Sequence, residues 1–343
     1  MKNFKVFICF IISFFPIIVS SQFLIDSSDK TFSDVNSIYV KGVFCSVEFK
    51  KGASSAVILD GEIRAINPYD ELLIYHRQKG NKLEVWVEMP PHIVGQIKGF
   101  LRFTAPSDIT LTVENTFGNI IIDGIGNETV TLMTTAGTIN ANNIPCNAVF
   151  TTTTGSINCQ SINGDLTVET KSGNISAKDI KGFATINGTS GTINLDKVKE
   201  EVNIISTSGS QLISGINSDV TTSATTGRIE VVDVKGNVDV STTTGQIRLV
   251  DIVGEIKAES TKGAIKGNSI KITGNSSFES ENGAIEMEFL NQPKTLSYDI
   301  SSNSGSLEAE GTKNSRRVKI KEGDIMIEGV TTSGNQKYST RNK

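Results

Sequence analysis

Residues 151–180 read TTTTGSINCQSINGDLTVETKSGNISAKDI, and within this stretch Gly155 and Gly173 stand 18 residues apart. Glycine recurs at that interval without a break at Gly137, Gly155, Gly173, Gly191, Gly209, Gly227, Gly245 and Gly263. Looser copies of the unit surround Gly118, Gly283 and Gly305. A short unit repeated at a fixed interval is typical of a solenoid, in which each repeat packs only against its neighbours.

The positions around each glycine form columns of one residue type. Isoleucine stands two residues after the glycine in nearly every unit, as at Ile139, Ile157 and Ile175. Further aliphatic or small residues follow with polar residues between them, and this period of two predicts a β-strand. A second alternating run, such as Leu166 and Val168, predicts another strand in each unit.

Two strands per unit suit an antiparallel meander or a parallel β-solenoid, and the columns favour the solenoid. In a parallel stack each residue lies about 4.8 Å from its counterpart in the next coil, which favours like-on-like columns. Small residues three positions before each glycine fit a tight inward corner, and the glycine then occupies a turn needing positive φ or close backbone approach. The sequence therefore predicts an all-β, single-stack parallel β-solenoid with 18-residue, two-strand coils and strand-rich caps.

The chain divides into four predicted segments. Residues 1–21 carry two lysines ahead of an apolar run from Val6 to Val19, which is short for a membrane span and predicts a signal peptide cleaved before Gln22. Residues 22–109 are strand-rich but irregular and predict an N-terminal cap. Residues 110–290 hold the solenoid repeats, and residues 291–343 predict C-terminal coils and a second cap.

Composition narrows the classes of partner. Removal of Lys2 and Lys5 with the signal peptide changes the formal net charge from −4 to −6, with both signs interspersed, so nucleic acid is a poor partner. No second stretch approaches a membrane span, and we expect no transmembrane segment in the mature chain. Cys45, Cys146 and Cys159 form no disulfide framework and no zinc-binding pair, although a bridge between the last two stays open.

The stretch from Thr151 to Ile180, together with LRFTAPSDITLTVENTFGNIIIDGI before the repeats, resembles the bacterial putative-adhesin family of exported β-strand repeat proteins. The resemblance covers about residues 32–335 and implies a β-solenoid of the cell envelope or surface. It implies no catalytic residues, because the recurring positions are turn and core positions. One unit departs from the pattern, since Gln211 replaces the isoleucine after Gly209, and there we expect a local β-bulge.

Candidate catalytic groups are sparse. Asp179, Asp233 and Asp251 follow their glycines by six residues, and the last two would stack like a carboxylate pair, but they fall at a predicted turn where aspartate is ordinary. His76 and His92 lie in the N-terminal region without a nucleophile motif beside them. We expect no catalytic, metal or cofactor site and no cofactor. The eight regular glycines are expected to be structural turn residues, and the ligand-binding residues stay unknown.

The leading hypothesis is a non-enzymatic, exported interaction module of the cell envelope or surface, adhesive in character. It would act in the periplasm, at the cell surface or outside the cell, on an unknown protein or glycan partner. Two alternatives stay open: a carbohydrate-active enzyme built on a β-helix, and a structural or envelope-stress component without a specific ligand. An enzyme should show a cleft where carboxylates and aromatic rings converge, whereas only 6% of this chain is aromatic.

Overall fold

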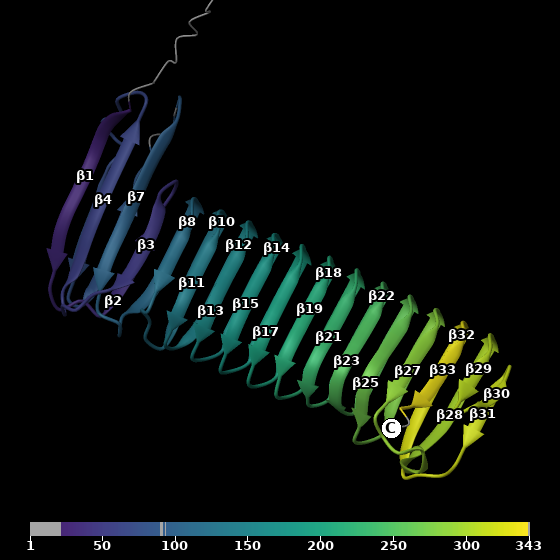
Figure 1. The fold of residues 1–343 in the computed structure, drawn as a ribbon. Coiled ribbons are helices and arrows are strands. Elements are labelled where there is room, and N and C mark those ends of the chain that lie inside the picture. Colours follow the sequence, from purple (N-terminus) through teal and green to yellow (C-terminus); the bar gives the residue numbers. More distant parts are fainter. Residues whose placement is uncertain (1–21, 90–91, 93, 342–343) are drawn as a thin grey trace, which may run out of the picture.

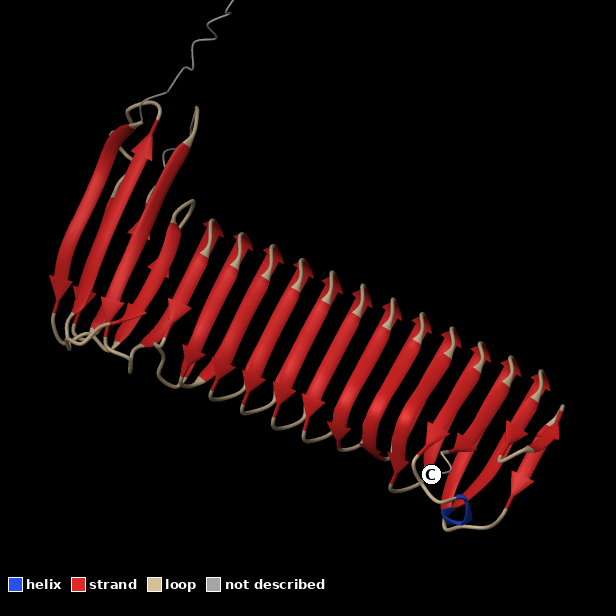
Figure 2. Cartoon of the chain, in the orientation of Figure 1, coloured by secondary structure: helices blue, strands red, loops and turns tan. Residues whose placement is uncertain are grey.

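The computed structural model describes residues 22–89, 92 and 94–341, so the expected signal peptide lies outside the described residues. The described residues form a rod of two facing β-sheets and contain one short 3-10 helix (Figures 1 and 2). We call the 17-stranded sheet "sheet A" and the 16-stranded sheet "sheet B". The predicted all-β solenoid is confirmed.

Each regular coil contributes one strand to each sheet. The strands in sheet B are β8 (Thr110–Phe117), β10 (Thr129–Ala136), β12 (Asn147–Thr154), β14 (Leu166–Ser172), β16 (Ala184–Ser190), β18 (Val202–Ser208), β20 (Val220–Thr226), β22 (Val238–Thr244), β24 (Ile256–Lys262) and β26 (Ser276–Asn282). Those in sheet A are β9 (Ile120–Asp123), β11 (Ile139–Ile144), β13 (Ile157–Ile162), β15 (Ile175–Ile180), β17 (Ile193–Val198), β19 (Gln211–Ile216), β21 (Ile229–Lys235), β23 (Ile247–Gly254), β25 (Ile265–Ile272) and β27 (Ile285–Phe289).

The register from coil to coil is parallel and keeps the 18-residue spacing. Ile157 pairs with Ile139 on one side and with Ile175 on the other, so the isoleucine column of the sequence is a column in space. These side chains are buried between the two sheets, and the alternate residues point outward. The interior is thus a continuous aliphatic stack, in which each coil buries its apolar positions against both neighbours.

The predicted bulge at Gln211 is wrong. Gln211 pairs in unbroken register with Ile193 and Ile229, and its side chain is buried in the isoleucine column. Its amide nitrogen donates to the Ser206 hydroxyl at 2.8 Å and to the Ser223 carbonyl at 2.9 Å, while its amide oxygen accepts from the Thr222 hydroxyl. A polar residue therefore occupies a core position without a bulge, because its amide is satisfied on both sides.

The strands of the N-terminal end are β1 (Phe23–Phe32), β2 (Ser37–Lys41), β3 (Ser46–Lys51), β4 (Val57–Ala65), β5 (Ile74–Lys79), β6 (Lys82–Val87) and β7 (Ile97–Ala105). Their stacking order differs from their chain order. The coil formed by β2 and β3 lies between the coil formed by β6 and β7 and the first regular coil, β8 and β9. Antiparallel strands cover the outer side of the coil formed by β6 and β7. In sheet B, β5 pairs with β6, and in sheet A, β4 lies between β7 and β1 (Figure 1).

The C-terminal end is also stacked out of chain order and covered by antiparallel strands. It consists of the 3-10 helix η1 (Pro293–Thr295) and the strands β28 (Leu296–Ser304), β29 (Leu307–Ala309), β30 (Thr312–Asn314), β31 (Arg317–Ile320), β32 (Ile325–Ser333) and β33 (Gln336–Thr340). The last coil, β32 and β33, lies between β26 and β27 on one side and β28 and β29 on the other. Antiparallel β31 and β30 then cover the outer edges. In Figure 1 the last strand, β33, accordingly lies beside β27 rather than at the tip of the rod.

Aromatic side chains fill the rod interior near both ends. Phe49 and Phe103 stack at 4.4 Å between ring centroids near the N-terminal end. Near the C-terminal end Tyr298 and Tyr338 are fully buried, and the Tyr298 hydroxyl donates to the Glu310 carboxylate at 3.0 Å. Burial, together with the Glu310 carboxylate, raises the pKa of Tyr298. Large rings thus close the ends of a core that is mostly aliphatic along its length.

Candidate functional site

The eight regular glycines lie in the turns that lead from sheet B to sheet A. A Cβ added at any of them would come within 1.7–2.1 Å of the carbonyl oxygen of the preceding glycine in the stack. Gly191 shows the requirement most clearly, because its φ of +122° is also a conformation that other residues rarely adopt. These positions stack backbone directly on backbone and leave no side chain to contact a ligand.

The aspartates six residues after the glycine occupy a second special column. Asp179, Asp233 and Asp251 have φ values of +56°, +52° and +54°, and Lys197 in the same column has +60°. Asp233 and Asp251 lie on adjacent coils and are exposed. Aspartate tolerates the left-handed conformation better than most residues, so these carboxylates have a local conformational reason to be there.

The histidines and cysteines do not form a catalytic group. The His76 ring packs edge-on against Phe32 at 5.4 Å, and His92 is exposed in a loop. All three described cysteines are free, and burial raises the pKa of both Cys45 and Cys159 to about 12. Across the described ranges no three His, Cys, Asp or Glu residues gather in a metal-binding group, and no helix there is long and apolar enough to cross a membrane.

A cluster of outward-facing aromatic side chains stands at the N-terminal end of sheet B. Leu83, Val85 and Val87 of β6 point into the core, so Trp86 between them points outward. Tyr75 of β5 lies opposite Trp86 across the antiparallel pair, and the two rings stack at 5.5 Å with planes 14° apart. We call these two stacked, partly exposed rings "the aromatic wall".

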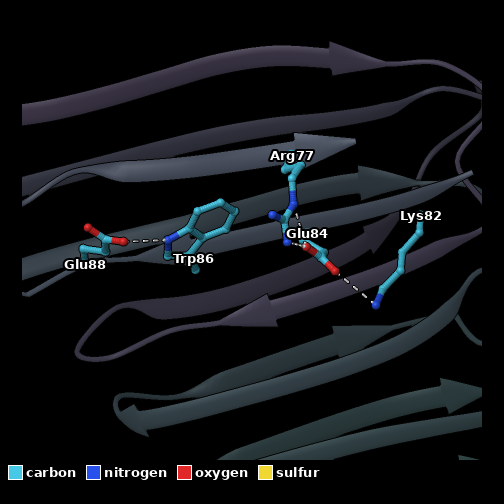
Figure 3. A network of polar contacts seen from close by, with 5 residues as sticks. All are labelled: Arg77, Lys82, Glu84, Trp86 and Glu88. Carbon is cyan, nitrogen blue, oxygen red and sulfur yellow. Dashed lines mark hydrogen bonds and ion pairs between the residues drawn. The ribbon is translucent and has the colours of Figure 1, made fainter. Parts of the chain in front are cut away.

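Polar contacts hold the aromatic wall in place (Figure 3). The Trp86 indole nitrogen donates to Glu88 at 3.3 Å, and the Arg77 guanidinium lies 5.7 Å from the centre of the Trp86 ring. Arg77 also donates to Glu84 through Nε at 3.0 Å, and Lys82 approaches the same carboxylate at 3.2 Å. Hydrogen bonds from Arg77 and Lys82 lower the pKa of Glu84, so this carboxylate stays charged in the network.

A shallow hollow of about 290 Å³ lies beside the wall on the same face of sheet B. Lys41 of β2 pairs with Trp86 on one side and with Glu114 of β8 on the other, which makes the wall and the hollow continuous. Met133 and Thr151 continue this row and line the hollow with Lys41 and Glu114. Tyr39 also stands outward on β2, and burial together with the Glu114 carboxylate raises its pKa.

The other half of the same face has a different character. Two grooves of about 630 and 650 Å³ run over sheet B from β18 to β32. Their lining is hydroxyl-rich and acidic, and includes Asp219, Asp239, Glu255, Glu259, Glu279, Glu281 and Glu328. Lys257 is the one basic residue lining these two grooves in the described chain, and it pairs with Glu259 at 2.9 Å.

The sequence pattern missed the wall and the hollow. Their members come from β2, β5, β6, β8, β10 and β12, and nothing in chain order indicates that β2 lies between β6 and β8. One local signal existed, since the alternation of Leu83, Val85 and Val87 already places Trp86 on the solvent side. The structure brings this tryptophan together with Tyr75 and Lys41, which the sequence left apart.

Comparison with known proteins gives a family and several similar solved structures. The sequence model of a family described as Toastrack DUF4097 matches residues 107–214 and again residues 200–337. No curated protein matches the chain. Solved structures similar to it include a "putative cell adhesion protein" from Clostridium sporogenes ATCC 15579, with 9% identity, TM-score 0.18 and coverage of 92% of this chain and 100% of that one. Another is a "putative adhesin" from Bacteroides fragilis NCTC 9343, with 13% identity, TM-score 0.25 and coverage of 94% and 99%.

Proposed function

Because the chain belongs to the Toastrack DUF4097 family, we propose that it is an exported, non-enzymatic interaction module of the cell envelope or surface, adhesive in character. Its partner would be a protein or glycan, bound on the outer face of sheet B. The observation that carries this proposal is the aromatic wall. Tyr75 and Trp86 stand outward and partly exposed, where the regular coils carry mainly Thr, Ser, Asn and Glu.

The contrast with the repeat supports a contact role for this end. Most outward positions in the regular coils are polar and differ from coil to coil, as at Glu169, Asn187 and Ser223, and Ile205 in the same column is an exposed apolar exception. Aromatic residues at a surface contribute large contact area at low cost in side-chain entropy, which is why they are enriched where proteins bind partners. The rod then acts as a rigid stalk that presents this end.

The non-enzymatic part of the proposal rests on the candidate carboxylates. Asp233 and Asp251 lie within β21 and β23 rather than at the predicted turn, in a left-handed backbone conformation that aspartate tolerates. Glu84 and Glu88 beside the wall are held in an ion pair and a hydrogen bond at the surface. The purified chain incubated with a panel of polysaccharides should release no new reducing ends. Release that an Asp233→Asn variant abolishes would support the enzyme alternative instead.

Export is tested separately from binding. Expression of the full chain followed by fractionation should place it outside the cytoplasm, with Gln22 as its new N-terminus by protein sequencing. An uncleaved, cytoplasmic chain would contradict the localisation. This part of the proposal is supported by the signal peptide that the sequence predicts for residues 1–21.

Binding is tested with intact cells. The labelled mature chain should bind to cells or to immobilised matrix proteins and glycans in a saturable manner, and unlabelled chain should compete. A variant of the opposite sheet, Lys178→Ala on the outer face of β15, serves as a matched surface control and should bind as the parent does. Uptake that rises linearly with concentration and is not competed would contradict the interaction module and favour a structural component.

A further inference from the structure

We infer that the aromatic wall and the adjoining hollow form a binding site for an uncharged saccharide, with a sugar ring packed beside Trp86 and its hydroxyls held by Lys41 and Glu114. This inference rests on the proposed function and names a ligand class for it. It begins with the position of Trp86, whose partly exposed ring has Tyr75 on one flank and Lys41 on the other. A sugar ring presents an apolar C–H face that packs well against an aromatic side chain.

The polar groups beside the wall match the hydroxyls of a sugar. Each sugar hydroxyl can donate and accept at once, so it is bound best where a donor and an acceptor stand side by side. Lys41 and Glu114 are register partners on β2 and β8, and they line the hollow together. An ammonium supplies only donors and a carboxylate only acceptors, so this pair can hold two neighbouring hydroxyls.

The charges indicate that the saccharide is uncharged. Both signs of charge are interspersed here. Three carboxylates, Glu84, Glu88 and Glu114, stand among the four basic side chains Lys41, Arg77, Lys79 and Lys82. Arg77 and Lys82 are paired with Glu84, and the Glu88 carboxylate accepts from the Trp86 indole. A polyanion would meet three carboxylates here and a polycation four basic groups, whereas an uncharged ligand is repelled by neither.

The size and rigidity of the site fit a short glycan segment. The hollow of about 290 Å³ is at the lower end of the volumes found for small-ligand sites. The stacked rings and their polar contacts fix the wall before any ligand arrives, which reduces the side-chain entropy lost on binding.

Trp86 provides the readout, since it is the one tryptophan of the chain. The mature chain is applied to a printed array of neutral and charged glycans, and neutral oligosaccharides that bind are titrated while the tryptophan emission is followed. We expect saturable changes in emission, with an affinity that varies less than about twofold between 0.05 and 0.5 M NaCl. A blank array, or binding that leaves the emission unchanged, would overturn the assignment.

Variants separate the site from the fold. Trp86→Ala should weaken binding roughly tenfold or more, as measured by calorimetry. Glu114→Gln and Lys41→Met alter only outward groups and should each weaken it about five- to tenfold while the emission assay stays usable. Phe183→Ala, at an exposed turn phenylalanine of a regular coil, should bind like the parent chain. If Trp86→Ala, Glu114→Gln and Lys41→Met bound the saccharide as tightly as the parent chain and the Phe183→Ala control do, the site would be overturned.

Failure of this inference is distinguishable from failure of the proposed function. Saturable cell binding that survives Trp86→Ala and Glu114→Gln would leave the interaction module standing and overturn the saccharide site. A steep loss of affinity with salt, or capture of a protein ligand that protects Trp86, would likewise overturn an uncharged saccharide. Loss of both cell binding and array binding in the parent chain would contradict both proposals.

Discussion

The regular coils and the N-terminal end of the rod share the same two sheets, yet they differ in what each column of residues holds. In the regular coils most inward columns are aliphatic, one column holds small residues such as Thr152 and Ser206, and the turn glycine recurs in each coil, so that neighbouring coils are nearly alike. At the N-terminal end the coil of β2 and β3 is inserted out of chain order, and aromatic rings stand both inside and outside the sheets. The repeated packing of the regular coils stabilises the rod. The irregular end carries outward aromatic and charged side chains that do not recur from coil to coil.

The strongest test of the regular part is the glycine column. Gly191→Ala should lower the free energy of unfolding by at least about 3 kcal/mol, because its Cβ would lie 2.0 Å from the Gly173 carbonyl oxygen in a left-handed turn. Urea denaturation followed by circular dichroism measures this loss. Gly188→Ala is the matched control three residues away, where the nearest atom is a flexible Ile193 methyl at 3.3 Å and Ala224 fills the equivalent position two coils on. A comparable loss in both variants would refute the steric account.

Gln211 tests whether a coil can be returned to the pattern of its neighbours. Gln211→Ala should cost about 2–3 kcal/mol, since it opens a cavity and leaves the Thr222 hydroxyl without its partner. The double variant Gln211→Ile with Thr222→Val restores residues found in the same columns of other coils and should be at least as stable as the parent. Thermal unfolding of the single, double and parent chains checks this, and a double variant weaker than the single one would contradict it.

The C-terminal end is tested through the ion pair that ties β31 to β28. Arg317 binds the Asp299 carboxylate at 2.8 and 2.6 Å, and with Lys319 it lowers the pKa of Asp299 from 3.8 to about 2. A lowered carboxyl pKa stabilises the fold above pH 3.8, and this contribution is lost as the pH falls toward 2. Asp299→Asn should therefore lower stability by about 1 kcal/mol at neutral pH and by much less as the pH falls to 2 and below, measured by thermal midpoints across pH. An equal loss at both pH values would exclude the charge as its cause.

The smallest expected effect tests the left-handed backbone position of the regular coils. Lys197 is a long side chain at φ +60° in a column where Gly215 stands one coil on. Lys197→Gly should raise stability by about 0.5–1 kcal/mol because glycine adopts this conformation without strain. Lys199→Gly, outside the left-handed column, should lower it by a similar amount. Calorimetric midpoints that move in the same direction for both would contradict the conformational account.

The sequence predicted the regular coils well because equivalent residues of successive units occupy the same environment, and so the same residue type recurs at each position. Ile139, Ile157 and Ile175 had to share one environment, so their spacing alone revealed the two strands and the parallel stack. It could not reveal that β32 lies between β26 and β28, since any strand with this alternation can pair with any other. Gln211 was misjudged for a related reason, because its partners Ser206 and Thr222 come from different strands and only the folded stack brings them together.

The inserted C-terminal coil has a consequence for how the chain is made. Ser276 pairs with Ile327, so β26 gains its outer neighbour only after some fifty further residues have been synthesised. β28 and β29 are synthesised earlier, but they can join the rod only through β32 and β33. A chain cut short before residue 325 would leave β26 as an open sheet edge, and such edges invite association and degradation. The C-terminal end of the stack therefore closes only after β32 and β33 have been synthesised.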